Sequence, residues 1–367
     1  MKKKLVLLLL TSVIYPIGAQ TNNYRLLVGT YTNSGISEGI YSYEVNVETG
    51  IFKQMSVASA LVNPSYLALS SDKKFVYAVS GSGTTSKAGA FAFDAKNGDF
   101  RFLNSSDTHS QGPCFITASD KHVFTANYGG GSISVFGLKP DGSLSELLQL
   151  VKHTGSSINP NRQTKPYVHQ VIFTPDMQYL LANDLGTDLV TVYRYNKDGK
   201  DEILTPHDSI RVKTGSGPRH LTISKNGKLI YLLQELDGTV SVMTLNKGRL
   251  TIIQETSVVL KQGIETGAAD IHLSPDGKFL YATNRGTVND ITCFAVDKDG
   301  KLTLKQQIPT GGIAPRNFSL TPDGKYLFIG NQRSDQIVIM KRDKKTGWLT
   351  DTGKSIHVGA PVCLIFY

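Results

Sequence analysis

The sequence predicts an all-β protein, a seven-bladed β-propeller in which the first and last strands of the chain complete one blade. Three observations lead to this fold class. A unit of about fifty residues recurs along the chain, apolar residues alternate with period two within each unit, and complementary half-units lie at the two ends. The 367 residues contain no linker rich in Pro, Gly or Ser, so we expect one domain.

A clear copy of the unit begins with the apolar strand Asp270–Ser274 and turns at Pro275-Asp276-Gly277. It returns through Phe279–Asn284, continues through Ile291–Val296 and ends at Gly300. Alternation of period two bounded by Asp-Gly turns is typical of antiparallel strands joined by hairpins.

Turn residues mark the copies. The first turn recurs six times, at spacings of 48, 56, 50, 50 and 47 residues, on Asp72, Asp120, Asp176, Asn226, Asp276 and Asp323. A glycine of a later turn recurs seven times, as Gly50, Gly98, Gly142, Gly199, Gly248, Gly300 and Gly347. One blade therefore lacks its first turn.

The two chain ends supply that blade. Pro361–Phe366 has the pattern of an inner strand without a partner, and Leu26–Thr30 that of a second strand without a predecessor. Joining them closes the ring and removes exposed sheet edges. A β-sandwich, the alternative, predicts neither a period near fifty nor complementary ends.

Residues 1–19 have the layout of a secretory signal peptide. Lys2–Lys4 precede the apolar run Leu5–Ile14, and Gly18-Ala19 supplies small residues for cleavage. The run is too short to span a membrane, and no Cys directly follows it to carry a lipid anchor. A buried first element of the fold is the alternative. We expect residues 20–367 to form an exported, periplasmic domain.

Composition restricts the partners. Without the three lysines of the leader, the chain carries 36 basic and 30 acidic residues, spread through the turns. This pattern argues against nucleic-acid binding, and no other apolar stretch is long enough to cross a membrane. Cys114, Cys293 and Cys363 fit neither a disulfide framework nor a zinc site, so we expect three core residues. We expect a monomer.

In each blade the first strand begins, and the second strand ends, at the same face of the ring. Side chains at these positions can converge at the mouth of the central channel. The polar ones gather in four successive blades: His169, Gln170, Asn183 and Asp184; Arg219, His220, Gln234 and Glu235; Asp270, His272, Asn284 and Arg285; and Arg316, Asn317, Asn331 and Gln332.

Structural roles are the alternative for these residues. Asp and Asn at strand ends cap turns, and buried Arg-Glu or His-Asp pairs satisfy one another. This alternative applies most to Asp184, Asp270 and His272. The polar connection 152–165 is the longest on that face, and it is either a lid or an ordinary surface loop.

The residue types at the mouth indicate a chemistry. Arg219, Arg285 and Arg316 suit an anionic ligand, because guanidinium groups bind carboxylate or phosphate in a bidentate manner. Glu235 and the histidines are candidate general bases or acids. Together they favour hydrolysis or closure of a lactone that bears a negative group, with Arg or His stabilising the oxyanion. The sequence contains no Gly-x-Ser-x-Gly motif and no zinc spacing, so we expect no cofactor and no metal, although scattered Asn and Asp leave calcium open.

Seven segments add a family likeness that spans nearly the whole chain: Leu27–Thr32, Asn159–Gln163, Gly217–His220, Gln234–Leu236, Ala268–His272, Asn284-Arg285 and Ala314–Phe318. They resemble the β-propeller lactonases, which include bacterial 6-phosphogluconolactonases and fungal carboxymuconate-lactonising enzymes. The resemblance places the catalytic positions of that family on His169, Arg219, Glu235 and Arg285. It implies hydrolysis of 6-phospho-D-glucono-1,5-lactone or of a related lactone.

In the mechanism that we expect, Glu235 is the base and His169 or His220 assists it. Arg219 and Arg285 hold the anion and the oxyanion. The substrate-binding set is completed by His220, Asp270, His272, Arg316, Gln332 and Asp184.

Two features depart from the resemblance. Pro166-Tyr167-Val168-His169 lacks the first His of the Pro-His-x-His that many members have. A phosphorylated sugar lactone is a cytoplasmic metabolite, whereas the leader predicts export. Either the export prediction is therefore wrong, or the substrate differs from the one in the family name. Two other functions remain alternatives: a secreted, non-catalytic propeller that binds glycan or protein through Tyr31 and Tyr128, and a lactone-forming cycloisomerase.

Overall fold

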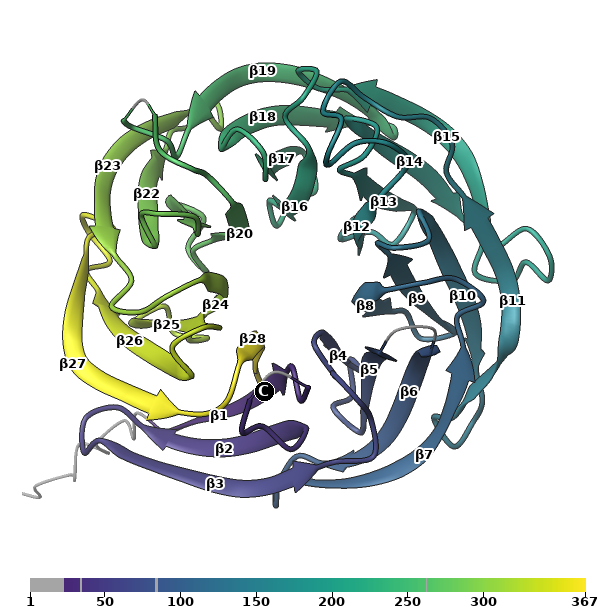
Figure 1. Cartoon of the computed structure of the whole chain (residues 1–367), viewed down its shortest axis with the longest axis horizontal. Coiled ribbons are helices and arrows are strands. Elements are labelled where there is room, and N and C mark those ends of the chain that lie inside the picture. The colour runs from purple at the N-terminus through teal and green to yellow at the C-terminus, as the bar shows by residue number, and fades with distance from the viewer. Residues whose placement is uncertain (1–22, 34, 83–84, 262) are drawn as a thin grey trace, which may run out of the picture.

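The computed structural model describes residues 23–33, 35–82, 85–261 and 263–367. They form seven antiparallel sheets of four strands, arranged as blades in a ring (Figure 1). The predicted leader, residues 1–19, lies outside the described residues. The described ranges hold no helix that could cross a membrane.

Within each blade the strands follow one another from the centre of the ring outward. The first three blades contain β4 (Leu67–Leu69), β5 (Phe75–Ser82), β6 (Thr85–Asp94) and β7 (Asp99–Asp107); β8 (Pro113–Ala118), β9 (His122–Asn127), β10 (Ser132–Leu138) and β11 (Leu144–Lys152); and β12 (Val168–Phe173), β13 (Tyr179–Asp184), β14 (Leu189–Tyr195) and β15 (Leu204–Arg211).

The next three blades contain β16 (Pro218–Ile223), β17 (Leu229–Gln234), β18 (Thr239–Asn246) and β19 (Arg249–Ser257); β20 (Ala268–Leu273), β21 (Phe279–Asn284), β22 (Asp290–Val296) and β23 (Leu302–Pro309); and β24 (Pro315–Leu320), β25 (Tyr326–Asn331), β26 (Gln336–Arg342) and β27 (Leu349–His357).

The last blade joins the two ends of the chain, as the half-units predicted. Its strand order is β28-β1-β2-β3, with β28 (Pro361–Phe366), β1 (Asn23–Thr30), β2 (Ile40–Asn46) and β3 (Ile51–Ala58). In Figure 1 the yellow C-terminal strand β28 lies against the purple strand β1. Leu27 faces Ile365 and Val28 faces Leu364 in this antiparallel pair. The prediction of a propeller closed by the terminal strands is confirmed.

Side-chain hydrogen bonds explain why the turn signature recurs. In the turn between β4 and β5, the Ser70 hydroxyl donates to Asp72 and accepts the Phe75 N–H, while Asp72 accepts the Lys74 N–H. The same arrangement is built on Thr174, Ser224, Ser274 and Thr321 in later blades. Polar side chains thus satisfy the backbone where the strand ladder ends.

The core is divided among the blades. One apolar cluster lies between each pair of neighbouring blades. Two of these clusters join the blade of the terminal strands to its two neighbours. Successive residues of one strand enter different clusters: Leu180 packs toward the preceding blade and Leu181 toward the following one. Because both faces of the middle strands are buried, polar side chains collect at the strand ends.

Candidate active site

Six inner strands carry a β-bulge close to their first residue, including β28, where Val362 is the extra residue. In β12 the pairing with β13 shifts between Val168 and Gln170, which leaves His169 as an extra residue. Equivalent shifts occur at Cys114 in β8, Arg219 in β16, Ala269-Asp270 in β20 and Arg316 in β24. A bulge re-aims a side chain, and bulges are frequent beside active sites. Neighbouring blades therefore present equivalent residues to the centre of the ring.

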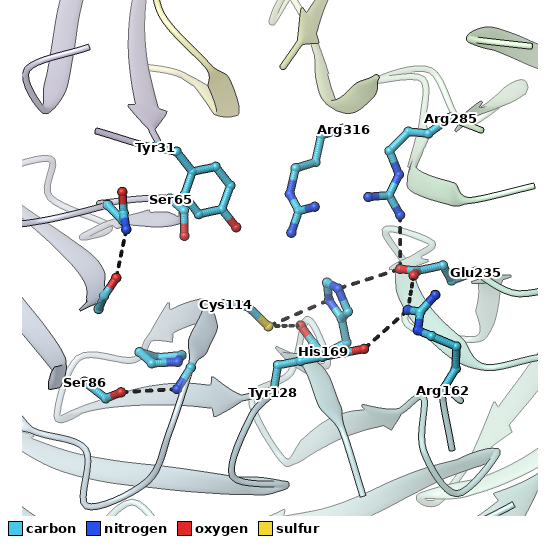
Figure 2. Close-up of a pocket in the computed structure, with 14 residues that line it drawn as sticks. Tyr31, Ser65, Ser86, Cys114, Tyr128, Arg162, His169, Glu235, Arg285 and Arg316 are labelled. Atoms are coloured by element: carbon cyan, nitrogen blue, oxygen red, sulfur yellow. Dashed lines mark hydrogen bonds and ion pairs between the residues drawn. The ribbon is translucent and has the colours of Figure 1, made fainter. Parts of the chain in front are cut away.

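Three of these residues, Cys114, His169 and Arg316, line a cavity of about 420 Å³ where the inner strands begin (Figure 2). Its polar lining includes Tyr31, Ser65, Tyr128, Arg162, His169, Glu235, Arg285 and Arg316. A recess of about 10 Å³ adjoins it and is lined in addition by Tyr66, Arg219, His220 and Val362. The cavity and its recess thus bring together the four residues expected to be catalytic.

Glu235 is the centre of the charged groups. Its Oε2 accepts hydrogen bonds from Arg219 Nε at 2.9 Å and pairs with Arg285 Nη2 at 3.1 Å. Its Oε1 accepts a hydrogen bond from Arg162 Nη2 at 2.5 Å. His169 Nε2 lies 4.0 Å from Oε2. Three guanidinium groups from separate segments of the chain therefore share one carboxylate, as Figure 2 shows for Arg162 and Arg285.

The surrounding charges determine the ionisation of these groups. Burial would raise the pKa of Glu235, but the charges of Arg285 and Arg219 and the hydrogen bond from Arg162 outweigh it and lower the pKa to about 2. Burial lowers the pKa of Arg285 to about 9, although Glu235 partly offsets this effect. At neutral pH the carboxylate is therefore ionised and Arg285 remains a cation.

Arg162 is the residue whose role the sequence did not reveal. It lies in the connection 152–165, which was expected to be either a lid or a surface loop. Gln163 anchors this loop, because its buried amide donates to Leu185 O and to Asp188 Oδ1. Arg162 contacts Tyr128 as well as Glu235 and is 42% exposed. The Asn159–Gln163 segment was a signal of resemblance, but no pattern within it indicates a contact with another blade.

A second polar network lies beside the recess. Asp270 accepts hydrogen bonds from His220 Nδ1 at 2.7 Å and His272 Nε2 at 2.9 Å. It also accepts from Asn317 Nδ2 at 2.5 Å and from the Phe318 N–H at 3.2 Å. Burial would raise the pKa of Asp270, but His272 and His220 hold it well below its usual range. Asp270 is thus an ionised carboxylate with both oxygens engaged.

The two histidines that line the recess, His169 and His220, are neutral. Burial and the charge of Arg219 hold the pKa of His169 well below its ordinary value, and the same two causes lower the pKa of His220 to about 4. The rings of these two histidines lie edge to face, with centroids 5.2 Å apart. Neutral imidazoles can accept a proton, whereas imidazolium ions cannot.

Arg316 is held differently from the other arginines of the cavity. Its guanidinium lies over the Tyr31 ring, 5.6 Å from the centroid, and no carboxylate of the described residues forms an ion pair with it. A cation on an aromatic face keeps its hydrogen-bond donors free for a ligand. Arg316 is therefore the guanidinium most open to an incoming anion.

Cys114 is placed differently from the expectation. Cys293 and Cys363 are buried in apolar clusters, as predicted, whereas Cys114 is partly buried, packs against an apolar cluster and also lines the cavity. All three thiols are free. Burial raises the pKa of the Cys114 thiol to about 12, so the thiol stays protonated at neutral pH.

Four residues of the expected substrate-binding set do not line the cavity or its recess: Asp184, Asp270, His272 and Gln332. The Asp184 carboxylate is buried and binds His153 Nδ1 and the N–H groups of Tyr167 and Gly186, which is a structural role. Asp270 contacts the recess only through His220. No group of three or more His, Cys, Asp or Glu in the described ranges could hold a metal ion.

Comparison with known proteins identifies the family. Residues 25–366 match the family model "Lactonase, 7-bladed beta-propeller". A 6-phosphogluconolactonase of Formosa agariphila is 36% identical, over 88% of this chain and 94% of that protein. A 6-phosphogluconolactonase of Bacillus subtilis is 33% identical, over 92% of this chain and 97% of that protein.

A solved structure agrees with these matches. The periplasmic gluconolactonase PpgL of Pseudomonas aeruginosa superimposes with a TM-score of 0.89, at 36% identity, over 94% of this chain and 99% of that chain. The match of sequence and fold thus extends over the same seven blades that build the cavity. The chain belongs to the seven-bladed β-propeller lactonase family and is by class a lactonase, a carboxylic ester hydrolase.

Proposed function

We propose that this protein hydrolyses an anionic sugar lactone, either 6-phospho-D-glucono-1,5-lactone or a related lactone outside the cytoplasm, in the cavity around Glu235. The observation that carries the proposal is the charge of the site. Four guanidinium groups and one carboxylate line the cavity and its recess, and the histidines there are neutral. Buried cations in excess favour a ligand that brings negative charge.

The arginines support two steps of ester hydrolysis. Arg316 is free to bind the anionic group of the substrate, because its donors are not committed to a carboxylate. Arg219 and Arg285 are fixed by Glu235 before substrate arrives, and such preorganised donors stabilise the oxyanion of the tetrahedral intermediate. Removing one such donor typically lowers kcat by about 100-fold to 1000-fold.

The Glu235 carboxylate is better suited to organising the arginines than to acting as a general base. A pKa of about 2 makes Glu235 a weak proton acceptor at neutral pH. Its two oxygens hold Arg162, Arg219 and Arg285 in place. We therefore propose that a neutral histidine of the site accepts the proton of the attacking water, and that Glu235 organises the cations around the substrate.

The signal-like leader supports a proposal of export. The gluconolactonase of Pseudomonas aeruginosa is named as periplasmic, and it shares the fold over nearly its whole length. Export would separate this protein from cytoplasmic phosphorylated lactones. A non-phosphorylated or differently charged lactone is then the natural alternative substrate.

The test follows acid release by residues 20–367 from fresh 6-phosphogluconolactone and from gluconolactone, with and without EDTA. We expect turnover above the spontaneous rate on at least one lactone, unchanged by EDTA, and a fall of about 100-fold or more in Glu235→Gln. Glu255→Gln, a change at an exposed residue of an outer strand, is the matched control. Absence of turnover on both lactones would overturn the proposal for these substrates.

A further inference from the structure

We infer that His220, oriented by Asp270, is the residue that takes the proton from the attacking water. This inference rests on the proposed lactone hydrolysis and names its general base. It is carried by three features: the hydrogen bond between the two residues, the free ring nitrogen of His220, and the small recess that this histidine lines.

Asp270 fixes the tautomer of His220. The Asn317 amide and the Phe318 N–H can only donate, so they keep Asp270 in its ionised, accepting form. An ionised carboxylate 2.7 Å from Nδ1 requires that Nδ1 carry the proton. In the neutral ring Nε2 therefore holds a lone pair.

Nε2 is buried and has no hydrogen-bond partner among the described residues. Burying an unsatisfied acceptor destabilises the folded state, so such atoms need a reason in a native structure. His220 lines the recess of about 10 Å³ that adjoins the cavity. That volume suits one water molecule. Nε2 can accept a hydrogen bond from this water and so orient it.

His169 is less suited to this role. Its nearest carboxylate, Glu235, lies 4.0 Å away, and the Nδ1 atom of His169 faces the Cys114 thiol at 3.9 Å. Neither contact fixes which nitrogen carries the proton. His169 lines both the cavity and the recess, so it can hold the lactone beside the water.

The step balances without a cofactor. The water oxygen forms a bond to the lactone carbonyl carbon while one water proton passes to His220 Nε2, and the carbonyl oxygen becomes the oxyanion beside Arg219. The bond between the carbonyl carbon and the ring oxygen then breaks. The leaving ring oxygen takes the proton back from Nε2, which regenerates the neutral histidine.

Two substitutions test this assignment. In Asp270→Asn the side-chain amide donates to Nδ1, which drives the His220 proton to Nε2 and removes the acceptor. In His220→Gln the side chain keeps polarity and bulk but cannot hold a proton. We expect each to lower kcat by about 100-fold to 10,000-fold while the affinity for the product, 6-phosphogluconate, changes by less than about threefold.

The control is His122→Gln. His122 is a buried histidine that forms a hydrogen bond with the Tyr195 hydroxyl, at the face of the ring away from the cavity. We expect the kcat of this variant to stay within about threefold of that of the unchanged protein. Histidine ¹⁵N NMR of the unchanged protein adds a readout that needs no substrate and no variant. We expect a protonated Nδ1 and a bare Nε2 on His220.

The outcomes separate the inference from the function. If the unchanged protein hydrolyses a lactone and His220→Gln keeps its kcat, the inference is wrong and the function stands. The same holds if product affinity falls as much as kcat, or if NMR finds the proton on Nε2. If the unchanged protein hydrolyses neither lactone, the proposed function fails and the inference fails with it.

Discussion

A single carboxylate organises three cations that come from different parts of the chain. Arg162 belongs to a loop, Arg219 to a bulge and Arg285 to a strand end, and among the residues that the structure describes only Glu235 contacts all three. Each guanidinium would otherwise repel the others. Because Glu235 holds all three cations, the positive site is preorganised, and substrate binding need not supply the cost of assembling it.

Asp290 is a residue outside the site with an equally specific consequence. It begins β22, is buried, and its Oδ1 has no partner in the described part of the chain. Burial raises the pKa of this carboxyl from 3.8 to about 7. The folded state therefore keeps a proton that the unfolded state loses, so the free energy of unfolding falls as pH rises from about 4 to about 7.

We expect Asp290→Asn to remove this dependence. Between pH 5 and pH 8 the unchanged protein should lose up to about 3 kcal/mol relative to the variant, which makes the variant the more stable protein at pH 8. Urea unfolding of both proteins at several pH values measures the difference. If the free energy of unfolding changed with pH in the same way for both proteins, the pKa of Asp290 would not be raised in the folded state.

Local pattern was enough to predict most elements, because the turn side chains and the alternation act within one hairpin. Phe279–Asn284 and Pro361–Phe366 were predicted with the bounds that β21 and β28 have. The bulges were not predictable, since an extra residue in a strand leaves period-two patterns nearly intact. Arg162 was missed because its contact with Glu235 joins segments 73 residues apart. Asp184 pairs with Val168 as Gln234 pairs with Pro218, so it lies one position before the equivalent of Glu235, and it binds its own loop.

The loop that carries Arg162 and the turn before Arg219 share one anchor, Asp188. This buried carboxylate accepts hydrogen bonds from Ser157 Oγ at 2.5 Å and from Gln163 Nε2 at 2.8 Å. It also accepts from the N–H groups of Gly215 at 2.7 Å and Gly217 at 2.8 Å. Both oxygens therefore face donors from two segments that support the site.

We expect Asp188→Asn to raise KM for the anionic lactone about 10-fold, with a smaller change in kcat. One Asn nitrogen must face two donors, which loosens the support of Arg162, and a lost interaction with a charged group is worth about 1.5 to 3 kcal/mol. Steady-state kinetics give the split between KM and kcat. In an Arg162→Ala background the same change should have little further effect on KM.

Asp335 provides the matched control for this prediction. It lies at the equivalent turn of another blade, has the same positive φ, and binds only the Ala360 N–H through its side chain among the contacts resolved there. Asp335→Asn should leave KM within about twofold. Additive effects of Asp188→Asn and Arg162→Ala on KM would contradict the proposed route through Arg162.

Closure of the ring connects the stability of the whole molecule to its site. β28 contributes Leu364 to the cluster shared with the preceding blade and Cys363 to the cluster shared with the following one. The Leu364 N–H also donates to Asn317 Oδ1, and the Asn317 amide donates to Asp270. The last strand therefore supports both neighbouring blades and the network that orients His220.

Ending the chain at Ala360 should abolish cooperative folding of the propeller. Val362, Cys363 and Leu364 are each at most 5% exposed, and burying such side chains contributes about 1.5 to 3 kcal/mol apiece, a large part of a typical stability of about 5 to 15 kcal/mol. The loss also leaves the edge of β1 unpaired, which favours aggregation. Thermal unfolding and light scattering measure both effects.

Adding a peptide of residues 361–367 should restore a cooperative transition, because the missing strand binds through its own ladder. If the shortened chain unfolded as cooperatively as residues 20–367 without the peptide, the six other blades would hold the ring without its closing strand.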